Sequence, residues 1–274
     1  VFAIDDDSLM QLDCAAEVMA IYEQDERGEI AGVGMVPDPF PPDEARHERT
    51  GEPGIPTVGR GLTGRVRAWM EEQLDMENQF VPYRSSDSMA SHPCRVGNRS
   101  LTSVRLFNGF RTTFRRTLGE KVAWCEVLRY YALHEDADFS YRLSQHGLLV
   151  VTAAARLCHL QAGGGRLSRD VVNRMRVLNL AALHKTFSQD LRSSALRLGW
   201  SYLRLSLLYL FIDVARQRFT VPTAKAYFLG IFALPRILNA PTDRFSETFS
   251  AEIERLVAPT PSTDPQRQNA RSPD

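Results

Sequence analysis

The sequence has no Cys-x-x-Cys pair, no net charge and no internal repeat, and each absence excludes a class of protein. Its four cysteines are scattered, so neither a zinc ribbon nor a redox motif is indicated, and a reducing cytoplasm is the default expectation. Lys+Arg and Asp+Glu both number 33 among 274 residues, so the overall charge gives no reason to expect a nucleic-acid partner. Hydrophobic residues make up 43% of the chain, enough for a globular core.

The sequence also lacks an initiator Met and a signal peptide, and residues 1–4 already have the composition of a buried strand. We therefore expect the chain to be N-terminally truncated, with further elements before this strand. Its two most apolar segments, 203–212 and 223–238, fall short of the roughly 20 uncharged residues that a membrane-spanning helix needs.

Charge is unevenly distributed along the chain. Residues 166–225 contain eleven Lys and Arg against three Asp, a local excess of +8, so the remainder carries −8. The same region contains basic, aromatic-rich segments with a helical pattern, and such helices can lie in a membrane interface. We expect an anionic membrane surface as a partner, with the protein peripheral on the inner, cytoplasmic face of the cell membrane. Ordinary packing of these helices against the rest of the protein is the alternative.

Hydrophobic periodicity predicts an α/β domain over residues 1–166. The predicted strands are 1–4, 30–36, 102–108 and 148–152. The predicted helices are 9–24, 63–79, 113–118 and 135–146. Two segments, 37–61 and 81–100, show no regular pattern and are interpreted as loops. Helical patterns over 167–192, 194–218 and 223–238 predict an amphipathic helical region over 167–258, and 259–274 has the composition of a disordered tail.

Three consecutive aspartates, Asp5, Asp6 and Asp7, follow the first predicted strand. Adjacent carboxylates repel one another, and a bound cation relieves this repulsion. Mg²⁺ and Mn²⁺ prefer oxygen ligands and often bind through one or two carboxylates plus substrate phosphates. The i,i+2 spacing of Asp5 and Asp7 puts both side chains on one side of an extended segment. The pattern predicts a metal-bridged phosphate site at a strand end, and an acidic surface turn is the alternative.

A second acidic cluster, Glu135 and Asp136, opens a predicted helix, where the helix dipole favours negative charge. Asp138 and Arg142 are spaced i,i+4 and can pair, which leaves a carboxylate free for chemistry. His159 follows the strand after this helix and could act as a neutral imidazole ligand or as a donor to a diphosphate. Helix capping and a surface ion pair are the alternative roles of the acidic residues.

Together with these clusters, three blocks of sequence resemble the family 2 glycosyltransferases, which have the GT-A fold. FAIDDDS is similar to the family's DxD motif, and FNGFRTTFRRT is similar to its Gly-containing segment with paired arginines. HEDADFSYRLSQHG, with HLQAGGGR after it, is similar to the ED-containing helix and the downstream His. The resemblance covers roughly residues 1–166 and implies a GT-A-like mixed sheet flanked by helices. The family's nucleotide-binding βαβ portion would precede Val1.

The resemblance implies an inverting, metal-dependent glycosyltransferase. Such an enzyme moves a sugar from a nucleotide-diphosphate donor to a hydroxyl of a glycan or a lipid-linked acceptor. Asp136 is the implied base, with Glu135 as the runner-up. The implied ligands of Mg²⁺ or Mn²⁺ and of the donor are Asp5, Asp7 and His159, and Asp6 could exchange roles with either neighbouring aspartate.

Further residues near these motifs have two interpretations each. Gly109 and Trp124 are implied acceptor-binding residues, although Trp124 fits core packing equally well. Arg115 and Arg116 could contact phosphates or remain solvated on a helix. The glycines at 163–165 suggest a loop that closes over the donor, or a simple linker.

Two functions of other classes stay open. A different metal-dependent phosphate enzyme, such as a nucleotidyltransferase, could also use paired carboxylates after a strand, but it gives no role to HEDADFSYRL. A non-catalytic, membrane-associated fragment is the other alternative. The carboxylates present in both clusters argue against such a decayed domain.

Overall fold

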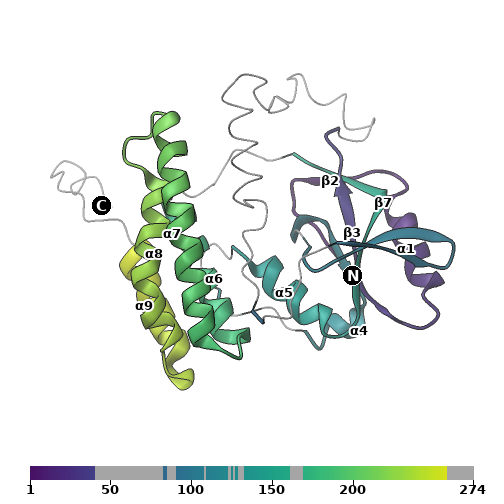
Figure 1. Ribbon diagram of the computed structural model, residues 1–274. Coiled ribbons are helices and arrows are strands. Elements are labelled where there is room, and N and C mark those ends of the chain that lie inside the picture. Colours follow the sequence, from purple (N-terminus) through teal and green to yellow (C-terminus); the bar gives the residue numbers. More distant parts are fainter. Residues whose placement is uncertain are drawn as a thin grey trace, which may run out of the picture. The chain divides into compact units, whose positions relative to one another are not determined.

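The computed structural model describes residues 1–40, 83–84, 91–107, 109–122, 125, 127–128, 133–160 and 169–257. The loop prediction beyond residue 40, the helix over 63–79 and the tail over 259–274 lie outside the described residues. The chain divides into two compact units (Figure 1). The sheet unit combines Val1–Glu126 with His134–Arg166, and the helical unit combines Val127–Leu133 with Leu167–Asp274.

The described part of the sheet unit is an α/β unit with a seven-stranded mixed sheet in the order β1-β6-β3-β7-β5-β4, with β2 paired to β7 beside this path. The strands are β1 (Phe2–Ala3), β2 (Ser8–Met10), β3 (Ile30–Pro37), β4 (His92–Val96), β5 (Arg99–Val104), β6 (Thr112–Phe114) and β7 (Leu148–His159). β6 is antiparallel to both β1 and β3, and β3 is parallel to β7. β1, β3 and β7 therefore run in the same direction, and their carboxyl ends meet at one edge, here called the carboxyl edge.

Helices cover both faces of this sheet, as Figure 1 shows. α1 (Cys14–Gln24) packs on one face in a core that includes Val150 of β7. α5 (Glu135–Ser144) packs on the other face in a core that includes Leu149. The two cores use neighbouring residues of β7 because successive side chains of a strand point to opposite faces. Two short helices, η1 (Gly109–Arg111) and α4 (Arg116–Gly119), flank β6 in sequence.

A tight turn joins α5 to β7 and sets the direction of the helix. Gly147 has a φ of +156°, and a Cβ at this position would lie 2.6 Å from the carbonyl oxygen of Glu29. The next residue, Leu148, donates its N–H to the same carbonyl at 2.7 Å. Because so few residues separate the two elements, α5 runs back along β7, and its N-terminus lies toward the carboxyl edge.

Several predicted elements have the wrong bounds or type. The helix predicted over 9–24 begins only at Cys14, because Ser8–Met10 pairs with β7 as a strand. Residues 81–100 are not all loop, since β4 and the start of β5 form a hairpin there. The strand predicted over 102–108 ends at Val104, and Thr112–Phe114 is a strand rather than the start of a helix. For Ser8–Met10 and Thr112–Phe114, pairing with strands far away in the sequence overrides the local pattern.

The helical unit contains the three long helices predicted from periodicity and a fourth. They are α6 (Arg169–Phe187), α7 (Leu191–Ala215), α8 (Pro222–Leu238) and α9 (Phe245–Val257), with the short η2 (Thr242–Arg244) before α9. Asp190 is the N-cap of α7, and its Oδ1 accepts hydrogen bonds from the N–H groups of Arg192 and Ser193, both at 3.1 Å. Buried Asp213 accepts from Thr223 and Ala224 and so satisfies the first N–H groups of α8.

Arg115, one of the two arginines predicted to contact phosphates, instead forms an ion pair within the sheet unit. Arg115 donates to Asp25 at 2.7 Å and to the carbonyl of Ile30 at 3.0 Å, and its guanidinium lies 5.1 Å from the ring centre of Tyr22. Asp25 also accepts from the N–H groups of Glu29 and Ile30. Burial raises the pKa of the Asp25 carboxyl, but these hydrogen bonds outweigh it, and the net pKa is lowered.

Replacing Asp25 with Ala should lower the free energy of unfolding of the sheet unit by about 3 kcal/mol, because it leaves a guanidinium and two N–H groups without their partner. Urea denaturation measures this change. The matched control is Glu120→Ala, which removes the exposed partner of Arg116. That surface pair should contribute less than about 1 kcal/mol. Equal losses in both variants would contradict the structural role given to Asp25.

Candidate carboxylate and metal site

The three aspartates lie where the chain crosses the carboxyl edge. β1 is at one end of the strand order, while β2 pairs with β7 beyond β6 and β3. The connection between β1 and β2 therefore passes over the carboxyl ends of the strands, and it contains Asp5, Asp6 and Asp7. The register Ser8↔His159 then brings the last residue of β7 beside this connection.

Asp5, Asp7 and His159 form a cluster that could hold a metal ion. His159 Nε2 lies 2.9 Å from Asp7 Oδ1 and 3.7 Å from Asp5 Oδ2, and the ligand atoms all lie within 4.8 Å of one another. The backbone holds this arrangement, since Leu160 donates its N–H to the carbonyl of Asp7 at 2.8 Å. Asp6 is exposed and lies outside the cluster. Carboxylate oxygens and an imidazole nitrogen are ligands that suit Mn²⁺, and the carboxylates suit Mg²⁺.

The second predicted pair, Glu135 and Asp136, forms the first turn of α5. The helix begins after His134, which has a left-handed φ of 70°. Asp138, also in this turn, is buried and pairs with Arg142 at 3.1 Å, as the i,i+4 spacing predicted. Asp136 does not share this ion pair, and its carboxylate is partly buried.

The pKa of Asp136 is affected by residues of both acidic clusters. Burial raises the pKa of Asp136, hydrogen bonds from the N–H groups of Ala137, Gly109 and Asp136 itself lower it, and the charge of Asp5 raises it again. The pKa of Glu135 is raised by burial and by the charges of Asp136 and Asp5. Asp5 therefore lies close enough to act on both acids of α5. The two acidic clusters share the carboxyl edge, although about 130 residues of chain separate them.

Gly109 brings η1 into this site. The N–H of Gly109 bonds to Asp136, and a Cβ at Gly109 would lie 3.6 Å from the Cβ of Asp136, so the glycine sits directly against this acid. Arg111 is half-buried two residues later, and burial lowers the pKa of its guanidinium.

The remaining predicted site residues have other positions. Arg115 belongs to the Asp25 pair, and Arg116 is an exposed partner of Glu120 at 3.0 Å, as expected of a solvated helix pair. Trp124 and the glycines at 163–165 lie outside the described residues.

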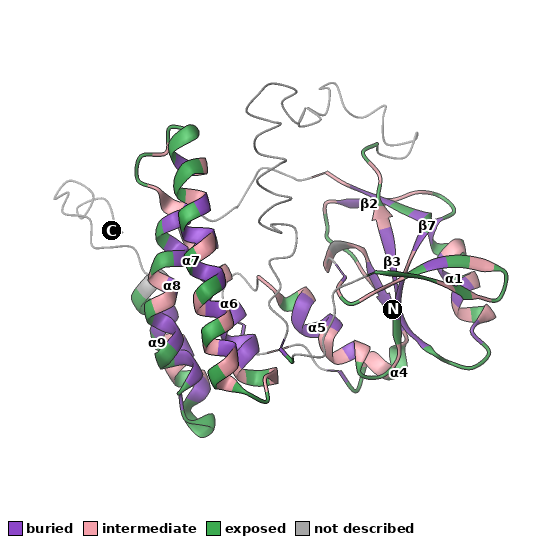
Figure 2. Cartoon of the chain, viewed as in Figure 1, coloured by how far each residue is buried: buried purple, intermediate pink, exposed green. Residues whose placement is uncertain are grey.

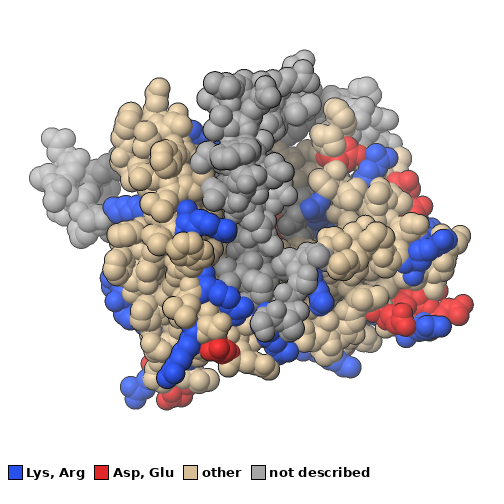
Figure 3. Space-filling view, in the orientation of Figure 1, with Lys and Arg blue, Asp and Glu red and all other residues tan. Residues whose placement is uncertain are grey.

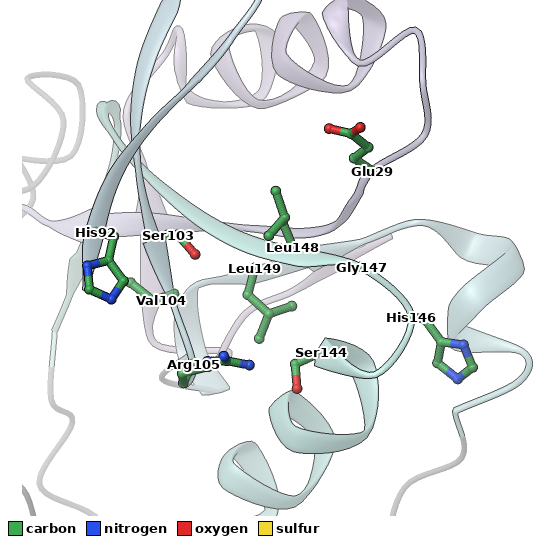
Figure 4. A pocket seen from close by; sticks show the side chains of 10 residues that line it. All are labelled: Glu29, His92, Ser103, Val104, Arg105, Ser144, His146, Gly147, Leu148 and Leu149. Carbon is green, nitrogen blue, oxygen red and sulfur yellow. The ribbon is translucent and has the colours of Figure 1, made fainter. Parts of the chain in front are cut away.

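A cavity of about 580 Å³ opens at the other edge of the sheet, and Figure 4 shows its lining. Its walls include the start of β7 at Leu148 and Leu149 and the C-terminal end of α5 at Ser144. His92 and His146 stand at opposite sides of it, while Arg105 points toward Ser144. None of the predicted site residues lines this cavity.

The raised pKa of Asp136 predicts how stability depends on pH without divalent ions. The fold favours the protonated acid, so ionisation of Asp136 should lower the free energy of unfolding as pH rises from its ordinary pKa of 3.8 through the raised value. Asp136→Asn removes this loss. In urea denaturation with EDTA, the variant should match the unchanged protein at the acidic end and exceed it at neutral pH. A difference that is constant across this range would contradict the prediction.

No protein-family model matches this chain, and no curated protein is similar to it in sequence.

Proposed function

We propose that the chain is the catalytic half of an inverting, metal-dependent glycosyltransferase with a GT-A-like arrangement. The observation that carries the proposal is the strand order: the connection with Asp5 and Asp7 crosses the carboxyl edge, and the N-terminus of α5 with Glu135 and Asp136 lies toward the same edge. The charge of Asp5, which raises the pKa of both acids, agrees with this placement. Open α/β sheets bind their ligands beyond the carboxyl ends of their strands. The substrates are a nucleotide-diphosphate sugar and a hydroxyl acceptor of a glycan or lipid-linked glycan.

In this proposal Asp5, Asp7 and His159 hold Mg²⁺ or Mn²⁺. When bound, the ion supplies neutralisation of the negative charge that develops on the diphosphate leaving group. The His159 Nε2 that contacts Asp7 fixes the orientation of that carboxylate.

Asp136 is the proposed general base. A base accepts the proton of the acceptor hydroxyl as the oxygen attacks the anomeric carbon, and a single displacement of this kind inverts the configuration. Burial raises the pKa of Asp136, which makes its carboxylate a better proton acceptor near neutral pH. The N–H groups of Ala137 and Gly109 hold the carboxylate in place.

The test is a donor assay on the full-length protein with Mn²⁺. UDP-, GDP- and dTDP-sugars are offered in turn, and release of the nucleoside diphosphate is measured with and without EDTA. Metal-dependent release from one donor supports the proposal. Pyrophosphate release from a nucleoside triphosphate would instead indicate a nucleotidyltransferase, and absence of metal-stimulated nucleotide binding would indicate a non-catalytic domain. The matched pair is Asp7→Asn against Asp6→Asn, since both neutralise one charge in the same turn.

A further inference from the structure

The longest helix of the helical unit presents a continuous apolar stripe to solvent. On α7, six large apolar residues recur at alternating spacings of four and three, and all are exposed. They are Leu196, Trp200, Leu203, Leu207, Leu210 and Val214, here called the α7 stripe. Phe211 lies beside it and is 69% exposed. The alternating spacing keeps these side chains on one face of the helix, and Figure 2 shows exposed residues along α7.

The opposite face of α7 is a protein core. Leu198, Tyr202, Leu205 and Leu208 are buried, and the hydroxyl of Tyr202 donates to the carbonyl of Val177 on α6 at 2.6 Å. The stripe is therefore not the face that packs this unit together. An exposed apolar area of this extent marks an interaction surface.

The charges beside the stripe identify its partner. Arg192, Arg197 and Arg204 each precede a stripe residue by three or four positions, so they border it on the helix. Arg192 is exposed, while Arg197 and Arg204 are half-buried. The one acid within α7, Asp213, is buried and bonds to the start of α8. Basic residues also outnumber acidic ones on the face of the helical unit that Figure 3 shows. An apolar stripe with a positive border complements an anionic lipid surface.

Two other arrangements fit these charges less well. Pairing of two α7 stripes from separate copies would bring arginines of both copies together, and no exposed acid of α7 would offset them. By length and composition α7 is also the one helix of the described residues that could cross a membrane. However, its buried face contains Ser201, Ser206 and Asp213, which suits a helix that lies in the interface better than one surrounded by lipid.

We propose that the α7 stripe docks peripherally on an anionic lipid bilayer, with its apolar side chains among the acyl chains and the exposed Arg192 at the phosphates. The stripe belongs to the helical unit, and its test requires no enzymatic activity.

Co-sedimentation of the full-length protein with lipid vesicles tests the proposal. We expect binding to phosphatidylcholine vesicles that contain phosphatidylglycerol, weakening as salt is raised, and little binding to phosphatidylcholine alone. Leu207→Gln with Phe211→Gln should lower the partition coefficient about tenfold or more. Leu196→Gln with Trp200→Gln should lower the partition coefficient by a similar factor. Agreement between the two double variants would show that the loss of binding does not come from misfolding of one of them. The control, Leu12→Gln, alters an isolated apolar residue that is 84% exposed and should leave binding unchanged.

Three results would overturn the proposal. The first is equal binding by the stripe variants and the unchanged protein. The second is a dimer in analytical ultracentrifugation that the stripe variants dissociate, because the stripe would then contact a second copy. The third is resistance of the bound protein to alkaline carbonate extraction, which would indicate a spanning helix.

Discussion

Replacing Asp136 with Asn should reduce sugar transfer by about 10²–10⁴-fold, the usual contribution of general base catalysis. Asn keeps the size of the side chain and can still accept hydrogen bonds from Ala137 and Gly109, so the start of α5 should not change. It cannot take the proton of the acceptor hydroxyl. Because the proposed donor ligands lie in the other cluster, the Kd of the nucleotide sugar should change little. Initial transfer rates and donor titrations measure the two quantities separately.

The neighbouring acid provides the control for this experiment. Glu135 is adjacent in sequence and shares the influence of Asp5, but it is more exposed than Asp136. Glu135→Gln should therefore retain most of the activity. The opposite pattern, an active Asp136→Asn and an inactive Glu135→Gln, would transfer the role of base to Glu135. Full activity in both variants would remove α5 from the mechanism.

Replacing Asp7 with Asn should weaken Mn²⁺ binding by about 100-fold. Loss of an outer partner of a metal ligand already lowers affinity by about 10–100-fold, so loss of a direct ligand should reach the upper end of this range. Asp7 is also the carboxylate that contacts His159 at 2.9 Å, so its removal affects two of the three proposed ligands. Isothermal titration with Mn²⁺ measures the affinity without any substrate.

Asp6→Asn is the matched control for Asp7→Asn. It removes the same formal charge one residue away, but its side chain is exposed and outside the cluster. The variant should bind Mn²⁺ within about threefold of the unchanged protein, because exposed charges are largely screened by solvent. Equal weakening in both variants would show a diffuse attraction by acidic charge rather than a coordination site.

The sequence alone predicted the elements whose patterns are local. β3 and α5 were expected at 30–36 and 135–146 and are found at Ile30–Pro37 and Glu135–Ser144. The hairpin β4–β5 was missed, although its turn contains Gly97 with a φ of +55°, and a glycine followed by Asn98 was an available signal. β7 was predicted over 148–152 but continues to His159, because β3 and β2 supply partners that a local pattern does not reveal.

The candidate site, too, was predictable from the sequence only in part. The carboxylates were recognisable because Asp5–Asp7 and Glu135–Asp136 are adjacent in sequence, and their meeting at one edge follows from strand directions that only the sheet defines. The contacts of Gly109 and the burial of Arg111 depend on tertiary neighbours. Arg115 looked like a phosphate ligand in sequence, and its partner Asp25 lies 90 residues earlier.

β7 runs from the cavity to the metal-type cluster. Leu149 lines the cavity near the start of this strand, and His159 ends it in the metal-type cluster. Between Leu149 and Leu157 this strand runs beside only the stretch from Gly32 to Pro37 of β3, which spans roughly 17 Å at about 3.3 Å per residue. The cavity and the metal-type cluster therefore share no residue of the described chain. A small molecule bound in the cavity would contact His92, Arg105 and His146 rather than the carboxylates.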